Sequence, residues 1–136
     1  MSARDIQIRM ALPDEGPAIG ELEGFKFKGW EMDWSDIGEG WLVAEMDGRI
    51  VGAIQVSPGK PFGRLESLAV EKDLGLKARA VIVKKLCYAA LATLRALGCQ
   101  AAIGMVQTKQ PGFKQVAEHR GCFSFAQGDM MIKRLV

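Results

Sequence analysis

The chain has 136 residues, of which 49% are hydrophobic and 25% are charged, and its formal net charge is +2. This length and composition are typical of an ordinary globular protein, so we expect a single domain over residues 1–136 rather than a disordered chain. The nearly balanced charge argues against nucleic-acid binding, which usually needs a clustered basic excess. No apolar run approaches the ~20 residues of a membrane-spanning helix, so no membrane association is expected.

The cysteines and the N-terminus indicate a reducing compartment. Cys87, Cys99 and Cys122 form no CxxC motif, and their spacing fits no zinc site, so no bound metal is expected. The first ten residues contain no apolar signal-peptide core, and we therefore expect no secretory signal, a cytoplasmic location and free thiols. The thiols are interpreted as small core side chains. A nucleophilic cysteine is the alternative, with His119 as the one histidine to serve it.

The first forty residues combine one clear strand with less regular segments. Residues 5–10 alternate apolar and polar side chains, which predicts a strand. Prolines then mark a helix start with Asp14 as a candidate N-cap, and a short helix is predicted over residues 18–25. Residues 28–40 are rich in glycine and acidic side chains, and they are typical of either a loop or a broken second helix.

The clearest element is a hairpin. Residues 41–46 and 49–56 are two apolar runs joined by Asp47 and Gly48. Such a dipeptide between apolar runs predicts a tight turn, because glycine accepts positive φ. After a segment rich in proline and glycine, residues 64–70 form the next predicted strand.

The second half begins with a long amphipathic helix, predicted over residues 79–97 and ended by Gly98. A strand follows over residues 100–106, then a shorter helix over 111–120, and residues 122–136 resemble a second hairpin. The apolar stripe of the long helix recurs every three or four residues and consists of Ala80, Val83, Leu86, Cys87, Ala90, Leu94 and Leu97.

The predicted element order is β-α-(α)-β-β-β-α-β-α-β-β. Strands interleaved with helices indicate the α/β class. The strands over 64–70 and 100–106, joined by the helix between them, should form a right-handed parallel crossover.

This order resembles the GNAT family of N-acetyltransferases, which use acetyl-CoA. The resemblance covers nearly the whole chain and is carried by the segments IQIRMALPDEGPAIGEL, WLVAEMDGRIVGAIQV, RLESLAVEKD and GCFSFAQGDMMIKRL. It implies a mixed central sheet with helices on both faces. It also implies transfer of an acetyl or related acyl group from coenzyme A to an amine of a small molecule or a protein, with a homodimer among the expected assemblies.

The family's cofactor loop carries Gln or Arg, two residues, Gly, one residue, and then Gly or Ala. Those three positions are held here by Gly75, Ala78 and Ala80, of which only Ala80 keeps the pattern. Such a loop binds pyrophosphate through backbone N–H groups at a helix N-terminus. Lys77, Arg79 or Lys84 would replace the missing basic side chain, and the alternative is an ordinary strand-to-helix turn. The resemblance assigns coenzyme A to Leu68, Ala69, Val70, Gly75, Leu76, Lys77, Ala78, Arg79 and Ala80.

Acyl transfer to an amine needs a general base. Alternation over residues 64–70 predicts that Arg64, Glu66, Leu68 and Val70 share one face, and Glu66 is the first candidate for this base. The alternative is a glutamate that forms a salt bridge, for instance with Arg64. The resemblance gives the thioester carbonyl a backbone N–H donor from residues 68–70.

The family's usual acid, a tyrosine, is replaced here by Ala117. His119, Cys122 or water would protonate the departing thiolate, and an exposed helix residue is the alternative role for His119. The loss of the acid and the altered loop also support a rival function, that of a GNAT-like domain without catalysis that acts as a binding or structural module.

The acceptor pocket is expected within residues 24–40 and the final hairpin loop. This segment has two interpretations. Its tryptophans line the pocket, or they only cap the sheet. The residues concerned are Trp30, Met32 and Trp34, with Glu31, Asp33 and Asp36 to attract a cationic amine.

Overall fold

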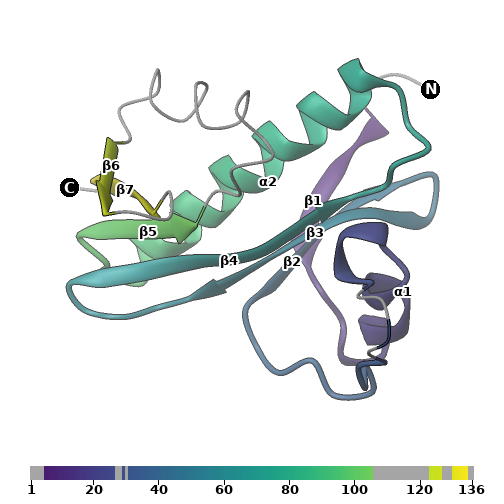
Figure 1. Cartoon of the computed structure of the whole chain (residues 1–136), viewed down its shortest axis with the longest axis horizontal. Helices are drawn as coiled ribbons and strands as arrows, with labels where there is room; N and C mark the ends of the chain where they lie inside the picture. The colour runs from purple at the N-terminus through teal and green to yellow at the C-terminus, as the bar shows by residue number, and fades with distance from the viewer. Residues whose placement is uncertain (1–4, 27–28, 30, 106–122, 127–129, 135–136) are drawn as a thin grey trace. The chain divides into compact units, whose positions relative to one another are not determined.

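The computed structural model describes residues 5–26, 29, 31–105, 123–126 and 130–134 (Figure 1). Its elements follow the predicted α/β order. They are β1 (Gln7–Met10), η2 (Pro13–Glu15), α1 (Gly16–Gly20), η3 (Glu23–Phe25), β2 (Trp41–Met46), β3 (Arg49–Ser57), β4 (Phe62–Val70), α2 (Leu76–Ala96), β5 (Ala101–Met105), β6 (Phe123–Ala126) and β7 (Met130–Arg134). Hydrogen-bonded strands run in the order β1-β2-β3-β4-β5-β7-β6.

The chain divides into two compact units. The first contains residues 1–55 and 67–90, and the second contains residues 56–66 and 91–136. The expected single domain therefore stays a prediction. In the described part of the chain, no helix is both long and apolar enough to cross a membrane.

In the first unit, β1, β2 and β3 form an antiparallel ladder. The predicted hairpin turn is confirmed, since Asp47 and Gly48 both have positive φ, 51° and 77°. Left-handed backbone at two successive residues is what a two-residue hairpin loop requires. The register pairs Met46 with Arg49 across this turn.

Helices lie on both faces of these strands, as the sequence predicts (Figure 1). On one face, Gly52 lies directly under α2, and a Cβ atom built on it would be 2.8 Å from Ile82 Cγ2. On the other face, α1 and η3 cover a buried cluster. This cluster contains Ile19, Leu22, Phe25, Trp41, Val43, Ala53 and Ala69.

The long helix is confirmed, but its start and its buried face differ from the prediction. It begins at Leu76 rather than at residue 79. Gly98, with φ of 87°, ends it, and the Cys99 N–H donates to the Leu94 carbonyl at 3.1 Å, as in a Schellman motif. The side chains fully buried by packing are Ile82, Leu86, Ala90 and Leu94, whereas Ala80 and Leu97 are exposed and Val83 and Cys87 are half-buried.

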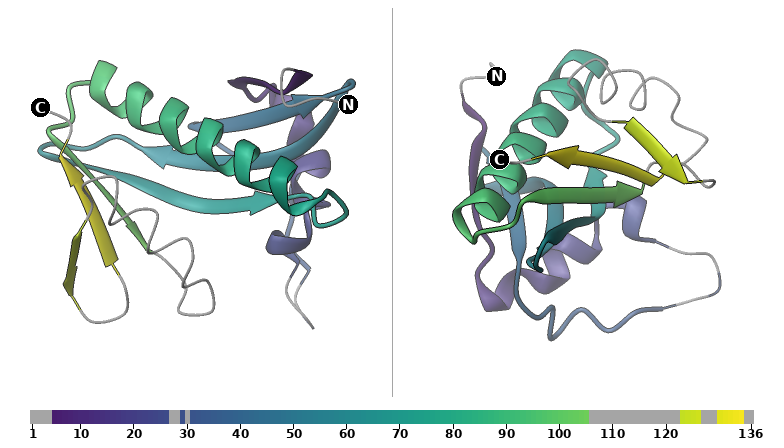
Figure 2. Two further views of the ribbon diagram at one scale, coloured as in Figure 1. Left: turned by 90° about the horizontal axis from the view of Figure 1, so that it is seen from above. Right: turned by 90° about the vertical axis from the view of Figure 1, so that its left-hand side faces the viewer.

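The second unit contains the parallel pair that the sequence predicts. β4 and β5 are parallel from Phe62 opposite Ala101 to Leu65 opposite Gly104. β7 pairs antiparallel with both β5 and β6, which confirms the terminal hairpin (Figure 2). Cys99 is buried, in agreement with its interpretation as a core residue. The predicted helix over 111–120 and Cys122 lie outside the described residues.

The segment after β1 differs most from expectation. The predicted helix over 18–25 is two short pieces, α1 and η3, and no helix occurs in the described residues 31–40. Asp14 is not the N-cap, because Glu15 precedes α1 and its Oε1 accepts from the Leu12 N–H at 2.7 Å. Two glycines in α1 and a glycine in η3 explain why a regular helix does not continue.

Glu15 also belongs to an ion-pair network around Arg9. The guanidinium of Arg9 donates to both carboxylate oxygens of Glu15 at 2.7 Å and to Glu45 at 3.0 Å. The Arg9 hydrogen bond is the main reason that the pKa of Glu15 lies below its usual value. This network links β1, β2 and η2 in a half-buried position.

We predict that Glu15→Gln lowers the free energy of unfolding at pH 7 by about 1–3 kcal/mol, the range for charge-assisted hydrogen bonds. Because the pKa of Glu15 is depressed in the folded state, this stabilisation is complete above the ordinary glutamate pKa and is lost as pH falls through the folded value. Urea unfolding at several pH values should show the wild-type advantage shrinking below about pH 4. The control is Asp14→Asn, at an exposed position, and an advantage constant down to pH 2 would contradict this account.

Candidate functional site

The candidate site begins with a backbone irregularity in β4. Ser67 has a φ of 45°, a left-handed conformation that residues other than glycine rarely adopt. On its N-terminal side, a Cβ on Gly63 would lie 2.8 Å from Leu94 of α2. On its C-terminal side, Ala69 belongs to the cluster under α1 and η3. A left-handed residue interrupts the regular alternation of a strand, so the alternation before Ser67 does not carry over to the residues after it.

This interruption removes the basis of one prediction. Regular alternation predicted one shared face for Arg64, Glu66, Leu68 and Val70. Before Ser67, Arg64 and Glu66 share a face. After it, Leu68 and Val70 point to the face opposite Ala69, which faces the cluster under α1 and η3. A bulge of this kind is how strands redirect side chains and backbone groups at functional sites.

Glu66, the candidate base, forms an ion pair. Its Oε1 lies 3.3 Å from Nε of Arg64, and its side chain is 38% exposed. The salt-bridge alternative for Glu66 therefore has direct support. An exposed ion pair holds a side chain only weakly, by about 0–1 kcal/mol, so the carboxylate stays accessible to a competing cation.

After β4, a short turn leads to a positive helix terminus. The first helical hydrogen bond runs from the Arg79 N–H to the Gly75 carbonyl at 3.0 Å. The N–H groups of Leu76, Lys77 and Ala78 therefore have no acceptor within the helix. No acidic residue occurs in the first turn. A Cβ on Gly75 would meet no atom within 4 Å, so the space beside it is open.

Arg79 supplies the most unusual polar atom of this turn. Its Nε is buried and has no hydrogen-bond partner in the described part of the protein. A buried donor without a partner costs about 1–3 kcal/mol, and such an atom calls for an acceptor that is not a side chain of the described residues. Around it, Leu76 is 82% exposed, Lys77 and Ala80 are exposed, and Ala78 is half-buried.

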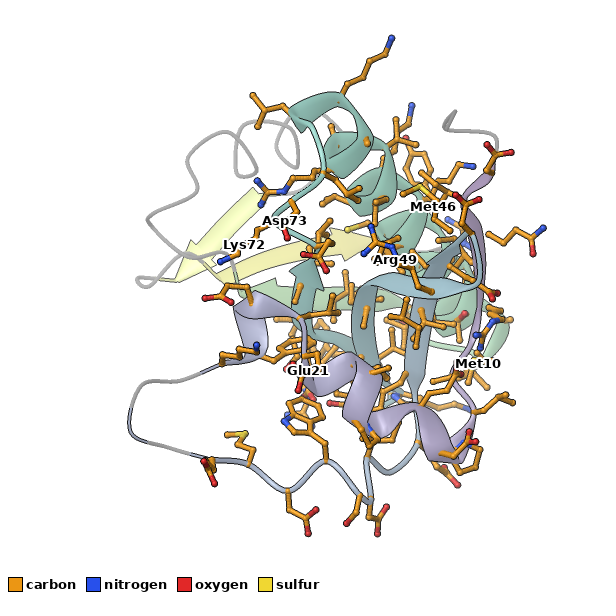
Figure 3. All side chains as sticks on the ribbon, turned by 90° about the vertical axis from the view of Figure 1, so that its right-hand side faces the viewer. Met10, Glu21, Met46, Arg49, Lys72 and Asp73 are labelled. Carbon is orange, nitrogen blue, oxygen red and sulfur yellow. The ribbon has the colours of Figure 1, made fainter. Side chains whose placement is uncertain are left out.

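Other basic residues near this turn already have partners. Lys72 pairs with Glu23 at 3.7 Å, Lys84 lies 5.8 Å from the centre of the Tyr88 ring, and Lys85 donates to the Ile6 carbonyl at 3.2 Å. In Figure 3, Lys72 and Asp73 lie at the approach to the helix. The basic charge next to the free N–H groups is therefore that of Lys77 and Arg79.

The acceptor-side segment is partly structural. Trp34 packs against Phe25 and Trp41 with ring centroids 5.5 and 6.0 Å apart, which supports the sheet-capping interpretation. Met32 is 44% exposed. Asp33 accepts from the Ser35 N–H at 2.9 Å, and hydrogen bonding to the Ser35 side chain, followed by this backbone contact, holds the pKa of Asp33 below its usual value. Asp36, likewise exposed, accepts from the Gly38 N–H at 3.1 Å, and Glu31 is also exposed.

Three site candidates, Trp30, His119 and Cys122, lie outside the described residues. Within the described ranges, no group of three or more His, Cys, Asp or Glu side chains is placed to hold a metal ion. Sequence reasoning missed the bulge at Ser67 and the buried Nε of Arg79. Neither feature is predictable from the sequence, because serine is common in strands and arginine is common in helices.

Comparison with known proteins gives likeness in structure alone. No protein-family model and no curated protein matches this chain. The ribosomal-protein-S18-alanine N-acetyltransferase of Escherichia coli superposes with a TM-score of 0.77 at 13% identity, over 96% of this chain and 94% of that chain. Ard1 from Thermoplasma volcanium gives a TM-score of 0.76 at 16% identity, over 97% and 99% of the two chains. The chain has the GNAT fold.

A third GNAT structure was determined with CoA. It is the N-acetyltransferase YhbS of Escherichia coli, with a TM-score of 0.70 and 17% identity over 97% of this chain and 82% of that one. The fold expected from the resemblance is thus confirmed. The identities are too low to transfer an activity, so the site residues must be argued from their own chemistry.

Ser67 gives a direct test of the bulge that shapes this part of the GNAT fold. We predict that Ser67→Gly keeps or raises stability, because glycine relieves a left-handed penalty of roughly 1–2 kcal/mol. Ser67→Val should lower the free energy of unfolding by about 1–3 kcal/mol, since a branched side chain resists this backbone. Urea unfolding measures both, with Ser57→Val as the control at a strand position without positive φ. Equal stability of the glycine and valine variants would rule out the bulge.

Proposed function

We propose that this chain transfers an acetyl or related acyl group from coenzyme A to an amine. The observation that carries the proposal is the buried Nε of Arg79, which has no partner in the described structure. It lies in the first turn of α2, where the N–H groups have no acceptor within the helix and no acidic residue occurs. The GNAT fold of the chain agrees with this assignment.

The first turn of α2 has the chemistry that the diphosphate of CoA requires. Backbone N–H groups and the positive end of a helix dipole favour an anion, and Arg79 adds a charge-assisted donor. Gly75 leaves open space for close approach. Leu76, Lys77, Ala78 and Ala80 complete the turn, and the backbone of Leu68, Ala69 and Val70 would receive the acyl end.

Each residue has a chemical task in this scheme. Bound CoA would supply the acyl thioester. Glu66 would take the proton that the attacking amine loses, as the C–N bond forms and the C–S bond breaks. A backbone N–H between Leu68 and Val70 would donate to the thioester oxygen as its charge grows. His119 or water would return a proton to the departing thiolate.

The proposed acceptor is an amine of a small molecule or a protein. Glu31, Asp33 and Asp36 are exposed on the segment after η3, and their carboxylates would favour a cationic amine. The E. coli neighbour acts on the alanine of a ribosomal protein, so a peptide that begins with alanine is a suitable first probe. We place this activity in the cytoplasm, where cysteines outside any disulfide, such as Cys87 and Cys99, would stay reduced.

The rival function is a GNAT-like binding or structural module without catalysis. The pairing of Glu66 with Arg64 and the alanine at position 78 favour it. A thermal-shift measurement with CoA separates the two functions, because a ligand that binds only the folded state raises the unfolding midpoint. At about millimolar CoA even a weak site would be half filled. An unchanged unfolding midpoint at that concentration would favour the binding or structural module.

We predict that Arg79→Ala weakens CoA binding by about tenfold to a hundredfold, the equivalent of one charge-assisted hydrogen bond. The loss should shrink as salt rises, because part of it is Coulombic. Titration calorimetry at two salt concentrations measures it. Lys84→Ala is the matched control, since Lys84 lies against Tyr88, and it should bind nearly as wild type does.

Ala78 tests the approach of the ligand to the backbone. Ala78→Gly should keep or improve affinity by restoring the glycine of the family signature, whereas Ala78→Val should weaken it by crowding the phosphate. If Arg79→Ala and both Ala78 variants bind CoA like wild type, the ligand lies elsewhere.

Glu66 is tested by turnover. We predict that Glu66→Gln lowers kcat/KM for acetyl-CoA and an alanine peptide by about 10²–10⁴-fold, as expected for a general base. Arg64→Gln removes the ion pair but keeps the carboxylate, and it should change the rate by about threefold at most. A Glu66→Gln enzyme that matches Arg64→Gln would exclude Glu66 from proton transfer.

A further inference from the structure

Gly24 of η3, just before the proposed acceptor segment, lies in close contact with Ala69 of β4, the strand that would bind the acyl group. A Cβ built on Gly24 would lie 2.9 Å from Ala69 Cβ and 3.5 Å from Ala69 Cα. Real side chains do not approach so closely, so η3 rests on β4 only because position 24 lacks a Cβ. Ala69 is 5% exposed and belongs to the buried cluster under α1 and η3.

An ion pair beside this contact connects the same two segments. Glu23 of η3 lies 3.7 Å from Lys72, which follows β4. In Figure 3, Lys72 reaches from the turn toward η3. The neighbouring pair, Lys26 with Glu21 at 3.3 Å, stays within the α1–η3 segment and makes no link to β4. The chain thus offers one ion pair that joins the segments and one that does not.

Two backbone hydrogen bonds fix the shape of η3. The Phe25 N–H donates to Leu22 at 2.9 Å, and the Lys26 N–H donates to Glu23 at 3.1 Å. Phe25 is anchored in the aromatic cluster with Trp34 and Trp41. A shift of Gly24 away from Ala69 would therefore move Phe25, and with it Trp34 of the segment after η3.

We propose that Gly24 is a positioning residue, which sets the distance between the acceptor segment after η3 and the acyl-binding backbone at Leu68 to Val70. The inference rests on the proposed acyl transfer. Gly24 touches neither reactant. Because Gly24 lets η3 lie against Ala69, this contact would set the distance between the bound amine and the acyl group.

The test is a double-variant cycle with Gly24→Ala, Ala69→Gly and both together. The added methyl of Gly24→Ala should push η3 off β4, and Ala69→Gly removes the atom that it would strike. With acetyl-CoA and an alanine peptide, Gly24→Ala should lower kcat/KM for the peptide by about tenfold to a hundredfold, the effect of a misplacement near 1 Å. The double variant should recover most of this loss, and the Kd for CoA should change about twofold at most.

Amide exchange gives a readout that needs no turnover. The N–H groups of Phe25 and Lys26 should exchange faster in Gly24→Ala and return toward wild type in the double variant. Glu23→Gln is the milder variant for the case that Gly24→Ala does not fold, and it should raise the peptide KM by about twofold to fivefold. Glu21→Gln, its matched control, should leave the KM unchanged.

The outcomes separate the two proposals. A wild type that neither binds CoA nor acetylates any tested amine overturns the proposed function. An active wild type matched by Gly24→Ala in peptide kcat/KM and in amide exchange overturns only the role of Gly24. The same follows if CoA binding and turnover fall together in Gly24→Ala without recovery in the double variant, because the methyl would then disturb the whole fold.

Discussion

A single left-handed residue, Ser67, interrupts the regular alternation of β4. Before it, Gly63 must face α2, because Leu94 and Cys99 occupy the space that a side chain would need. After it, Ala69 must face the cluster under α1 and η3. The strained backbone of Ser67 costs about 1–3 kcal/mol, and the burial on both sides of the strand offsets it.

Most basic side chains near α2 contact other residues of the protein, which reduces the charge that they offer to a ligand. Five basic residues lie near the turn before α2 in the sequence, but Lys72, Lys84 and Lys85 are directed toward Glu23, Tyr88 and Ile6. What remains at the helix terminus is the field of the free N–H groups with Lys77 and Arg79. The Arg9 network follows the same rule, since its bidentate contact with Glu15 fixes a chain segment and leaves little charge for a ligand.

The sequence predicts most of the fold because its strongest signals are local. Asp47-Gly48 specifies a hairpin turn, and Gly98 specifies a helix end, whatever surrounds them. The site is less predictable because it depends on contacts between distant segments. The alternation between Glu66 and Leu68 is interrupted by the positive φ of Ser67, which a serine in the sequence does not predict. The fit of Gly24 on Ala69 depends on the packing of η3 against β4. The helix predicted over 18–25 is broken for a related reason, since a Cβ on Gly20 would strike Trp34 and a Cβ on Gly24 would strike Ala69.

The altered cofactor signature is physically compatible with an anion site. At a helix N-terminus the ligands are backbone N–H groups, so a side chain there matters through the space it takes and the charge it adds. Ala78 lies within α2, where an alanine suits the helical backbone, and the open space at Gly75 lies one position ahead of the helix. The charge that the signature normally places first would come instead from Arg79, whose Nε is already buried. The guanidinium carries further N–H donors, and these would offer a phosphate oxygen a charge-assisted hydrogen bond. Affinity at this site should therefore depend on one guanidinium more than on any glycine.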